Sequence, residues 1–128
     1  GSIGAYGEEF DYPVFCDKYG EHRDLSVMGA REDESEKFYF KKPLTQGWCA
    51  VEYPDGTELT MRFPADKIPY LGILQNRGGF RDIYNIFLEP CSAPFDRPDV
   101  SRLRGQQSVL KGNSAYQWYV EIEIRSKQ

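Results

Sequence analysis

Hydrophobic and polar residues alternate along much of this chain with the two-residue period of β-strands. From 116 to 125, apolar and aromatic side chains occupy the even positions and mostly polar side chains occupy the odd ones. Residues 57–63 alternate in the same way and follow Tyr53-Pro54-Asp55-Gly56, which is typical of a tight turn. We therefore predict a half-buried antiparallel strand over 116–125 and a hairpin between 48–53 and 57–63.

A second hairpin is predicted around Gly78-Gly79. Two apolar runs, 70–74 and 83–88, flank this glycine pair. The second run ends in Glu89, which Pro90 follows at once. Because an ionised carboxylate is costly to bury without a partner, Glu89 is either a solvent-exposed residue at a strand end or a group held there for a function.

The remaining pattern predicts one more strand and one short helix. Residues 36–41 fit a strand that ends before Pro43. Residues 97–103 fit a helix with Pro98 in its first turn and Gly105 after its last. With about seven short strands, separated by turns roughly every eight to twelve residues, the sequence predicts an all-β fold of the antiparallel β-sandwich type.

Composition fits a single globular domain over residues 3–128. Hydrophobic residues make up 40% of the 128 residues and aromatic residues 15%, which is enough for a core. A net charge of −4 argues against a nucleic-acid partner, because phosphate backbones are bound by clustered Lys and Arg. With no apolar run of about 18 residues and no leader pattern, we expect a cytoplasmic chain without a membrane partner. Gly1-Ser2 is typical of the remnant of a cleaved tag.

Cysteine and histidine are scarce. Cys16, Cys49 and Cys91 are widely spaced and form no CxxC pair, as expected of reduced thiols in a cytosolic protein. His22 is the only histidine, whereas zinc takes three or four ligands, so the sequence predicts no metal site and no cofactor. Histidine is the usual proton-transfer residue, which makes His22 the one candidate for a general acid.

The order of motifs around Glu89 resembles the C-terminal part of the galactose mutarotase-like (aldose 1-epimerase) family. The resemblance rests on Ile68-Pro69-Tyr70-Leu71-Gly72-Ile73, Asn76 with Gly78-Gly79, Leu88-Glu89-Pro90-Cys91, and Pro94 with Asp96 to Asp99. It extends more loosely from Phe15 to Ile124. The resemblance implies that the chain is the later portion of a large β-sandwich, the family's supersandwich, and that Glu89 is the general base. The family's paired histidines lie in an earlier part of the chain and have no counterpart here.

The activity that the resemblance implies is the interconversion of the α and β anomers of an aldose. This reaction removes a proton from the anomeric hydroxyl and delivers one to the ring oxygen, so it needs both a base and an acid. Around the base Glu89, the expected substrate-binding residues are Asn76, Arg77, Asp82 and Tyr84, each of which also fits ordinary turn polarity.

Three functions stay open at this point. The first is the sugar-binding part of an epimerase-like protein, inactive or weakly active as this chain alone. The second is a non-catalytic carbohydrate-binding or sensing module, and the third is a structural interaction domain without a sugar site. The expected partners are a small-molecule sugar and either a second copy of the chain or the missing N-terminal part, because sheets cut from a larger sandwich expose their edges.

Overall fold

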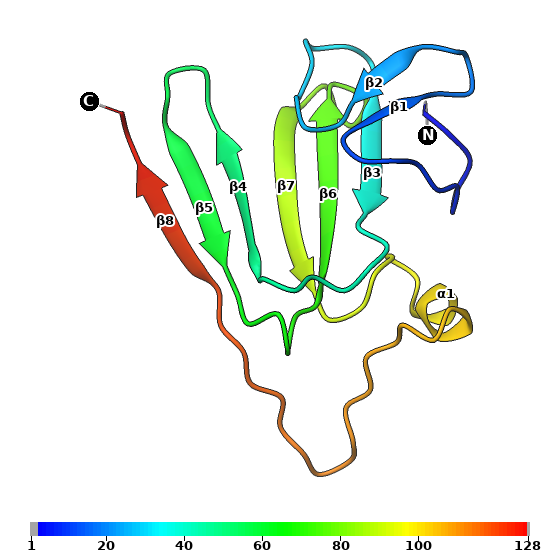
Figure 1. Ribbon diagram of the computed structural model, residues 1–128, viewed down its shortest axis with the longest axis vertical. Helices are drawn as coiled ribbons and strands as arrows, with labels where there is room; N and C mark the ends of the chain where they lie inside the picture. The colour runs from blue at the N-terminus through cyan, green and yellow to red at the C-terminus, as the bar shows by residue number, and fades with distance from the viewer. Residues whose placement is uncertain (1–2, 128) are drawn as a thin grey trace. The chain divides into compact units, whose positions relative to one another are not determined.

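A computed structural model describes residues 3–127, so the proposed tag remnant Gly1-Ser2 lies outside the described residues. This part of the chain forms eight strands and one short helix (Figure 1). The elements are β1 (Val14–Cys16), β2 (His22–Asp24), β3 (Ser35–Tyr39), β4 (Trp48–Glu52), β5 (Glu58–Arg62), β6 (Tyr70–Arg77), β7 (Tyr84–Cys91), α1 (Pro98–Leu103) and β8 (Glu121–Arg125). The predicted all-β antiparallel class is confirmed and is consistent with a sandwich-like fold.

The strands form three sheets, with the orders β1-β2, β3-β6-β7 and β4-β5-β8. The chain divides into two compact units. The first unit contains Gly1–Phe38 and Ile73–Phe87, and the second contains Tyr39–Gly72 and Leu88–Gln128. The β1-β2 sheet therefore belongs to the first unit and the β4-β5-β8 sheet to the second. The single domain predicted for residues 3–128 stays a prediction.

The predicted hairpin around Tyr53-Pro54-Asp55-Gly56 is confirmed. β4 and β5 pair antiparallel with Ala50 opposite Thr60. The turn closes with a 2.8 Å hydrogen bond from the Gly56 N–H to the Tyr53 carbonyl, and Gly56 takes a positive φ of 82° that suits glycine. The Asp55 carboxylate accepts the Thr57 N–H at 2.8 Å, and this bond lowers the pKa of Asp55.

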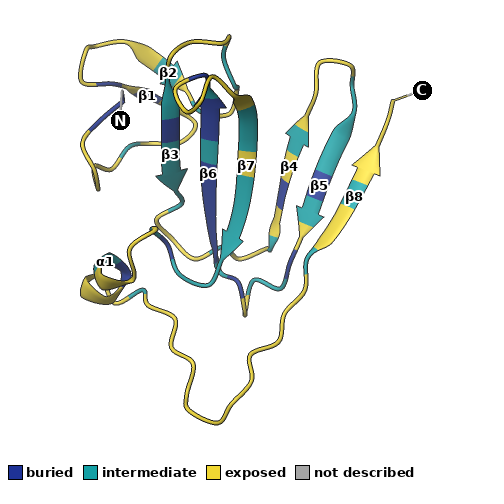
Figure 2. Cartoon of the chain, turned by 180° about the vertical axis from the view of Figure 1, so that it is seen from behind, coloured by how far each residue is buried: buried dark blue, intermediate teal, exposed yellow. Residues whose placement is uncertain are grey.

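The second predicted hairpin is also confirmed, and β6 is its buried strand. β6 and β7 are neighbours in the β3-β6-β7 sheet, and Figure 2 shows β6 as the most continuously buried strand. Its residues Tyr70, Leu71 and Ile73 are core residues, and Ile68 just before it is 2% exposed. Strands covered on both faces read as near-continuous apolar runs, which is what the sequence has at 70–74.

The prediction of a half-buried strand over 116–125 is wrong in its length and its burial. β8 begins only at Glu121, because its pairing partner β5 is five residues long and ends at Arg62, opposite Glu121. Ile122 is 59% exposed and Ile124 is 67% exposed. β8 is the last strand of its sheet, and the described residues leave most of both isoleucine side chains uncovered.

The stretch around His22, for which no element was predicted, is strand β2, in which His22 pairs with Cys16 of β1. Three residues are too few for the alternation to be read from sequence. The predicted helix is confirmed as α1, with Arg97 at its N-cap. Between α1 and β8 the chain runs through a long connection, and residues 107–119 of it are exposed throughout.

Candidate functional site

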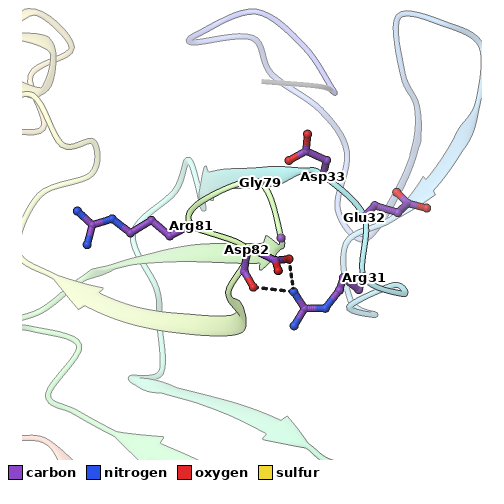
Figure 3. Close-up of a pocket in the computed structure, with 7 residues that line it drawn as sticks. Arg31, Glu32, Asp33, Gly79, Arg81 and Asp82 are labelled. Carbon is purple, nitrogen blue, oxygen red and sulfur yellow. Dashed lines mark hydrogen bonds and ion pairs between the residues drawn. The ribbon is translucent and has the colours of Figure 1, made fainter.

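The first unit contains an open cleft of about 510 Å³. It lies between the β6-β7 loop and the segment before β3 (Figure 3). We call it the Gly78 cleft. Its lining residues are Arg31, Glu32, Asp33, Gly78, Gly79, Arg81 and Asp82. A volume of roughly 300–1,000 Å³ is usual for sites that take small molecules, and the cleft falls within that range.

Asn76 closes the loop that forms one wall of the cleft. Its side chain is buried, with 2% of the residue exposed. The Asn76 Oδ1 accepts the Phe80 N–H at 3.0 Å, and its Nδ2 donates to the Phe80 carbonyl at 3.1 Å. Both ends of the amide are thereby used to close the turn at 78–80. The structure thus gives Asn76 a role in forming the loop, and its predicted contact with substrate stays a prediction.

Two glycines allow the two walls to approach closely. Gly78 has a φ of 118°, and a Cβ there would lie 2.5 Å from the carbonyl oxygen of Glu32. A Cβ on Gly79 would lie 2.5 Å from the carbonyl carbon of Glu34. The backbone of Glu32 also donates to the Arg77 carbonyl at 2.7 Å. Only residues without a side chain fit here, so the glycine pair is what holds the loop against the 31–34 segment.

Arg31 and Asp82 connect the two walls. The Arg31 guanidinium donates to the Asp82 carboxylate and to the Asp82 carbonyl, both at 2.6 Å (Figure 3). The same guanidinium lies 5.8 Å from the ring centre of Tyr84, whose hydroxyl donates to the Gly29 carbonyl at 2.7 Å. Asp82 has 89% of its side chain exposed, so this carboxylate keeps acceptor positions that face solvent.

Arg77, by contrast, is engaged in an ion-pair network next to the cleft. Only 13% of its side chain is exposed. Its guanidinium contacts the Glu32 carboxylate at 3.0 Å and forms a close ion pair with Glu34. Glu34 in turn lies 3.9 Å from Arg23. Because these carboxylates already occupy the guanidinium, the structural role of Arg77 is to tie the 32–34 segment to β6.

The network continues to a buried carboxylate, Asp17. Its side chain is fully buried and accepts the Arg23 Nε–H at 2.8 Å. It also accepts the backbone N–H groups of Tyr19 and Glu21, at 2.8 Å and 3.0 Å. The hydrogen bond from Arg23 is the main cause that lowers the pKa of Asp17, and the two backbone bonds add to it. Asp17 is thereby held ionised and fixes the turn between β1 and β2.

The second hollow measures about 130 Å³ and contains His22 and Arg77 in its lining, together with buried Gln75 and Glu36. It is smaller than the range usual for ligand pockets. The His22 Nδ1 lies 3.8 Å from the Cys16 sulfur. Within the part of the chain that the structure describes, no group of three or more His, Cys, Asp or Glu residues is placed to hold a metal ion.

Glu89 lies on β7 and is half-buried. It belongs to the second unit, whereas Asn76, Arg77, Asp82, Tyr84 and His22 all belong to the first. Glu89 lines neither of the two hollows. Its role as a general base therefore stays a prediction, and so does that of His22 as the acid.

Comparison of the chain with models of protein families, with curated proteins and with solved structures gave no match. Among residues 3–127, no helix is long and apolar enough to cross a membrane.

Sequence reasoning named Asp82 and the glycine pair but missed the opposite wall of the cleft. The segment 31–36 reads as a charged loop, and its charges do not indicate that it meets a turn more than forty residues later. One signal was present. Glycine in or beside a strand often marks a place where another backbone approaches closely, and Gly78-Gly79 lies between the two predicted strands.

Proposed function

We propose that this chain is a carbohydrate-binding domain of an aldose 1-epimerase-like protein, and that the Gly78 cleft is where the sugar binds. The cleft carries the proposal: a hollow of about 510 Å³ formed by the same loop that contains the family-like Asn76 and Gly78-Gly79 motif. Its size suits a monosaccharide, and its open side gives access from solvent.

The groups around the cleft suit a polyhydroxylated ligand. Three carboxylates, those of Glu32, Asp33 and Asp82, provide acceptors for sugar hydroxyl groups. The guanidinium groups of Arg31 and Arg81 provide donors. Bonds that involve a charged partner are about twice as strong as neutral ones, which favours carboxylate contacts to hydroxyl groups.

Aromatic surface is also close to the cleft. Phe80 is in the loop that forms the cleft and is 58% exposed, and Tyr84 is 43% exposed. Exposed rings next to hydrogen-bonding groups offer the apolar side of a sugar ring a surface on which to pack. Phe80 and Tyr84 are therefore the residues proposed to contact that side of the ligand.

For the parent protein we propose the interconversion of α and β anomers, with Glu89 as the general base and His22 as the only candidate acid in this chain. Neither residue lines the Gly78 cleft, so this proposal is separate from sugar binding in the cleft and rests on the sequence resemblance alone. A carboxylate can take the proton of the anomeric hydroxyl and return it after rotation, while a second group protonates the ring oxygen. No cofactor is needed for these proton transfers. We place this activity in the cytoplasm, and we expect the chain alone to be inactive or weakly active.

Binding is tested by titrating galactose and glucose into the isotopically labelled chain and following amide shifts by NMR. We expect shifts at 31–33 and 78–82, and a weaker response in Asp82→Asn, which removes a charged acceptor. Asp66→Asn is the matched control, because Asp66 is an exposed aspartate of the second unit. No shift at up to about 100 mM sugar, or equal binding in both variants, would contradict sugar binding in the cleft.

Catalysis is tested separately by polarimetry on freshly dissolved α-glucose and α-galactose. We expect no acceleration by the 128-residue chain. Acceleration that is lost in both Glu89→Gln and His22→Ala would show that this chain holds a complete acid–base pair. If no sugar binds and mutarotation is not accelerated, the results favour the third function, a structural interaction domain without a sugar site.

A further inference from the structure

The outer edge of β8 is unpaired within the described residues. β8 is the last strand in the order β4-β5-β8, and it pairs only with β5. Figure 2 shows it as mostly exposed along its length. The peptide groups on the outer side of such a strand can pair with another strand, which makes it a place for association.

The two faces of this sheet have opposite character. The pairing places Val51, Leu59 and Ile124 in one row across the three strands, and Cys49, Met61 and Ile122 in the next. All six side chains are on the same face. Burial decreases across it, because Cys49 is buried, Leu59 and Met61 are half-buried, and the two isoleucines of β8 are exposed. The apolar face therefore extends as far as β8, where its two isoleucines are exposed to solvent.

The other face of the sheet carries charges at the same edge. Glu121, Glu123 and Arg125 alternate with the isoleucines along β8. Arg62 of β5 contacts Glu123 at 2.8 Å and Glu121 at 3.6 Å, and Arg125 contacts Glu123 at 2.6 Å. Charged residues usually protect an edge strand from pairing with another chain. Here the two ends of the strand carry opposite charges, so antiparallel pairing of two copies brings Glu121 opposite Arg125 and leaves Glu123 opposite itself.

We propose that two copies of this chain associate by antiparallel pairing of their β8 strands, centred on Glu123. In this register, Glu121 of each copy lies opposite Arg125 of the other, and Ile122 lies opposite Ile124. Each dimer therefore gains two cross-strand ion pairs and two isoleucine pairs, both of which stabilise antiparallel strands. The three-stranded sheet becomes part of a continuous six-stranded sheet.

Neighbouring registers are less favourable. A shift that centres the pairing on Ile122 places Glu121 opposite Glu123, which brings like charges together twice. A shift to Ile124 keeps opposite charges together but moves Ile122 opposite Ser126, beyond the end of β8. In the proposed register the two Glu123 carboxylates meet at the axis, and each already has Arg62 and Arg125 as partners.

The interface is short, with five residues from each copy. It buries less than the roughly 1,000 Å² of stable complexes, so we expect a weak dimer. Sedimentation equilibrium from about 10 µM to 1 mM should give a mass that rises from 14.8 kDa towards twice that value. An average mass that stays at 14.8 kDa over this whole concentration range overturns the proposal.

Charge reversal identifies the interface. Glu121→Arg and Arg125→Glu each turn the two attractive pairs of the homodimer into repulsive ones, which should weaken association roughly tenfold or more. An equimolar mixture of the two variants restores both attractive pairs and should dimerise again. Lys111→Glu is the control for Arg125→Glu, because it makes the same change in charge at an exposed site outside the sheet and should associate like the wild type.

Recovery in the mixture cannot come from a variant that fails to fold. If both charge reversals leave association unchanged, as expected for packing of the apolar faces, edge pairing is wrong. It is also wrong if the mixture of the two variants stays monomeric. The register is checked with Glu123→Cys in a Cys16→Ser background, because residues facing each other across the axis are within disulfide reach. Oxidation should link the two copies at this position and not at a cysteine introduced in place of Lys111. Equal linking at both sites overturns the register.

Discussion

Replacing Gly78 with alanine should destabilise the first unit at the cleft. The new Cβ would lie 2.5 Å from the Glu32 carbonyl oxygen, so the two backbones must separate by about 0.5 Å to reach even a tight 3.0 Å contact. Overpacking of this kind costs about 1–3 kcal/mol. The φ of 118° adds a backbone cost of roughly 1–2 kcal/mol for a residue with a side chain.

Alanine also restricts the unfolded chain, which returns about 0.4–1 kcal/mol. The free energy of unfolding of Gly78→Ala should therefore fall by about 1–5 kcal/mol, measured by urea denaturation followed by far-UV circular dichroism. Moving the Glu32 backbone also strains its 2.7 Å hydrogen bond to the Arg77 carbonyl. Amide protection of Glu32 from hydrogen exchange should fall together with the stability.

Gly20→Ala is the matched control. Gly20 is also in the first unit and has a φ of 83°, but nothing lies within 4 Å of the position its Cβ would take. This variant has the backbone cost without the clash, so it should lose no more than about 1–2 kcal/mol. Equal losses in Gly78→Ala and Gly20→Ala would refute the argument that close approach to Glu32 is what requires glycine.

Two further predictions concern ionisable groups. Burial raises the pKa of the Cys49 thiol to about 11, so at pH 8 a disulfide reagent should modify the exposed Cys16 first. Cys49 should react only when the chain unfolds, and early reaction there would show that Cys49 is accessible to solvent in the folded sheet. Arg23 lowers the pKa of Asp17 below its ordinary 3.8, so this carboxylate stabilises the fold above that pH, and the stabilisation is lost as the pH falls through the lowered pKa. The stability difference between the wild type and Asp17→Asn should therefore be full at pH 6 and shrink below pH 3.8; a difference that does not change with pH would mean that the ionised form is not what the fold needs.

Local signals were sufficient for the hairpins. The Pro54-Asp55-Gly56 turn fixes β4 against β5, and the two apolar runs beside Gly78-Gly79 define β6 and β7. The burial of β8 was predicted wrongly because alternation shows which side chains share a face, and it carries no information on whether anything covers that face. Only the wall formed by the loop at 78–82 was predicted. The other wall comes from residues 31–33, which are distant in sequence and whose charges fit any exposed loop.

The exposed connection between α1 and β8 is also a place where the chain can be cut or can accept an insertion. A side chain added at Gly112 would meet nothing within 4 Å, and its neighbours from 107 to 119 are all exposed. New termini or an inserted domain at this position would disturb no packed residue. A chain cut there leaves β8 on a separate peptide whose pairing residues match β5, so the two pieces form a natural pair for fragment complementation. Recovery of the sheet on mixing them would then report directly on how strongly a single edge strand is held.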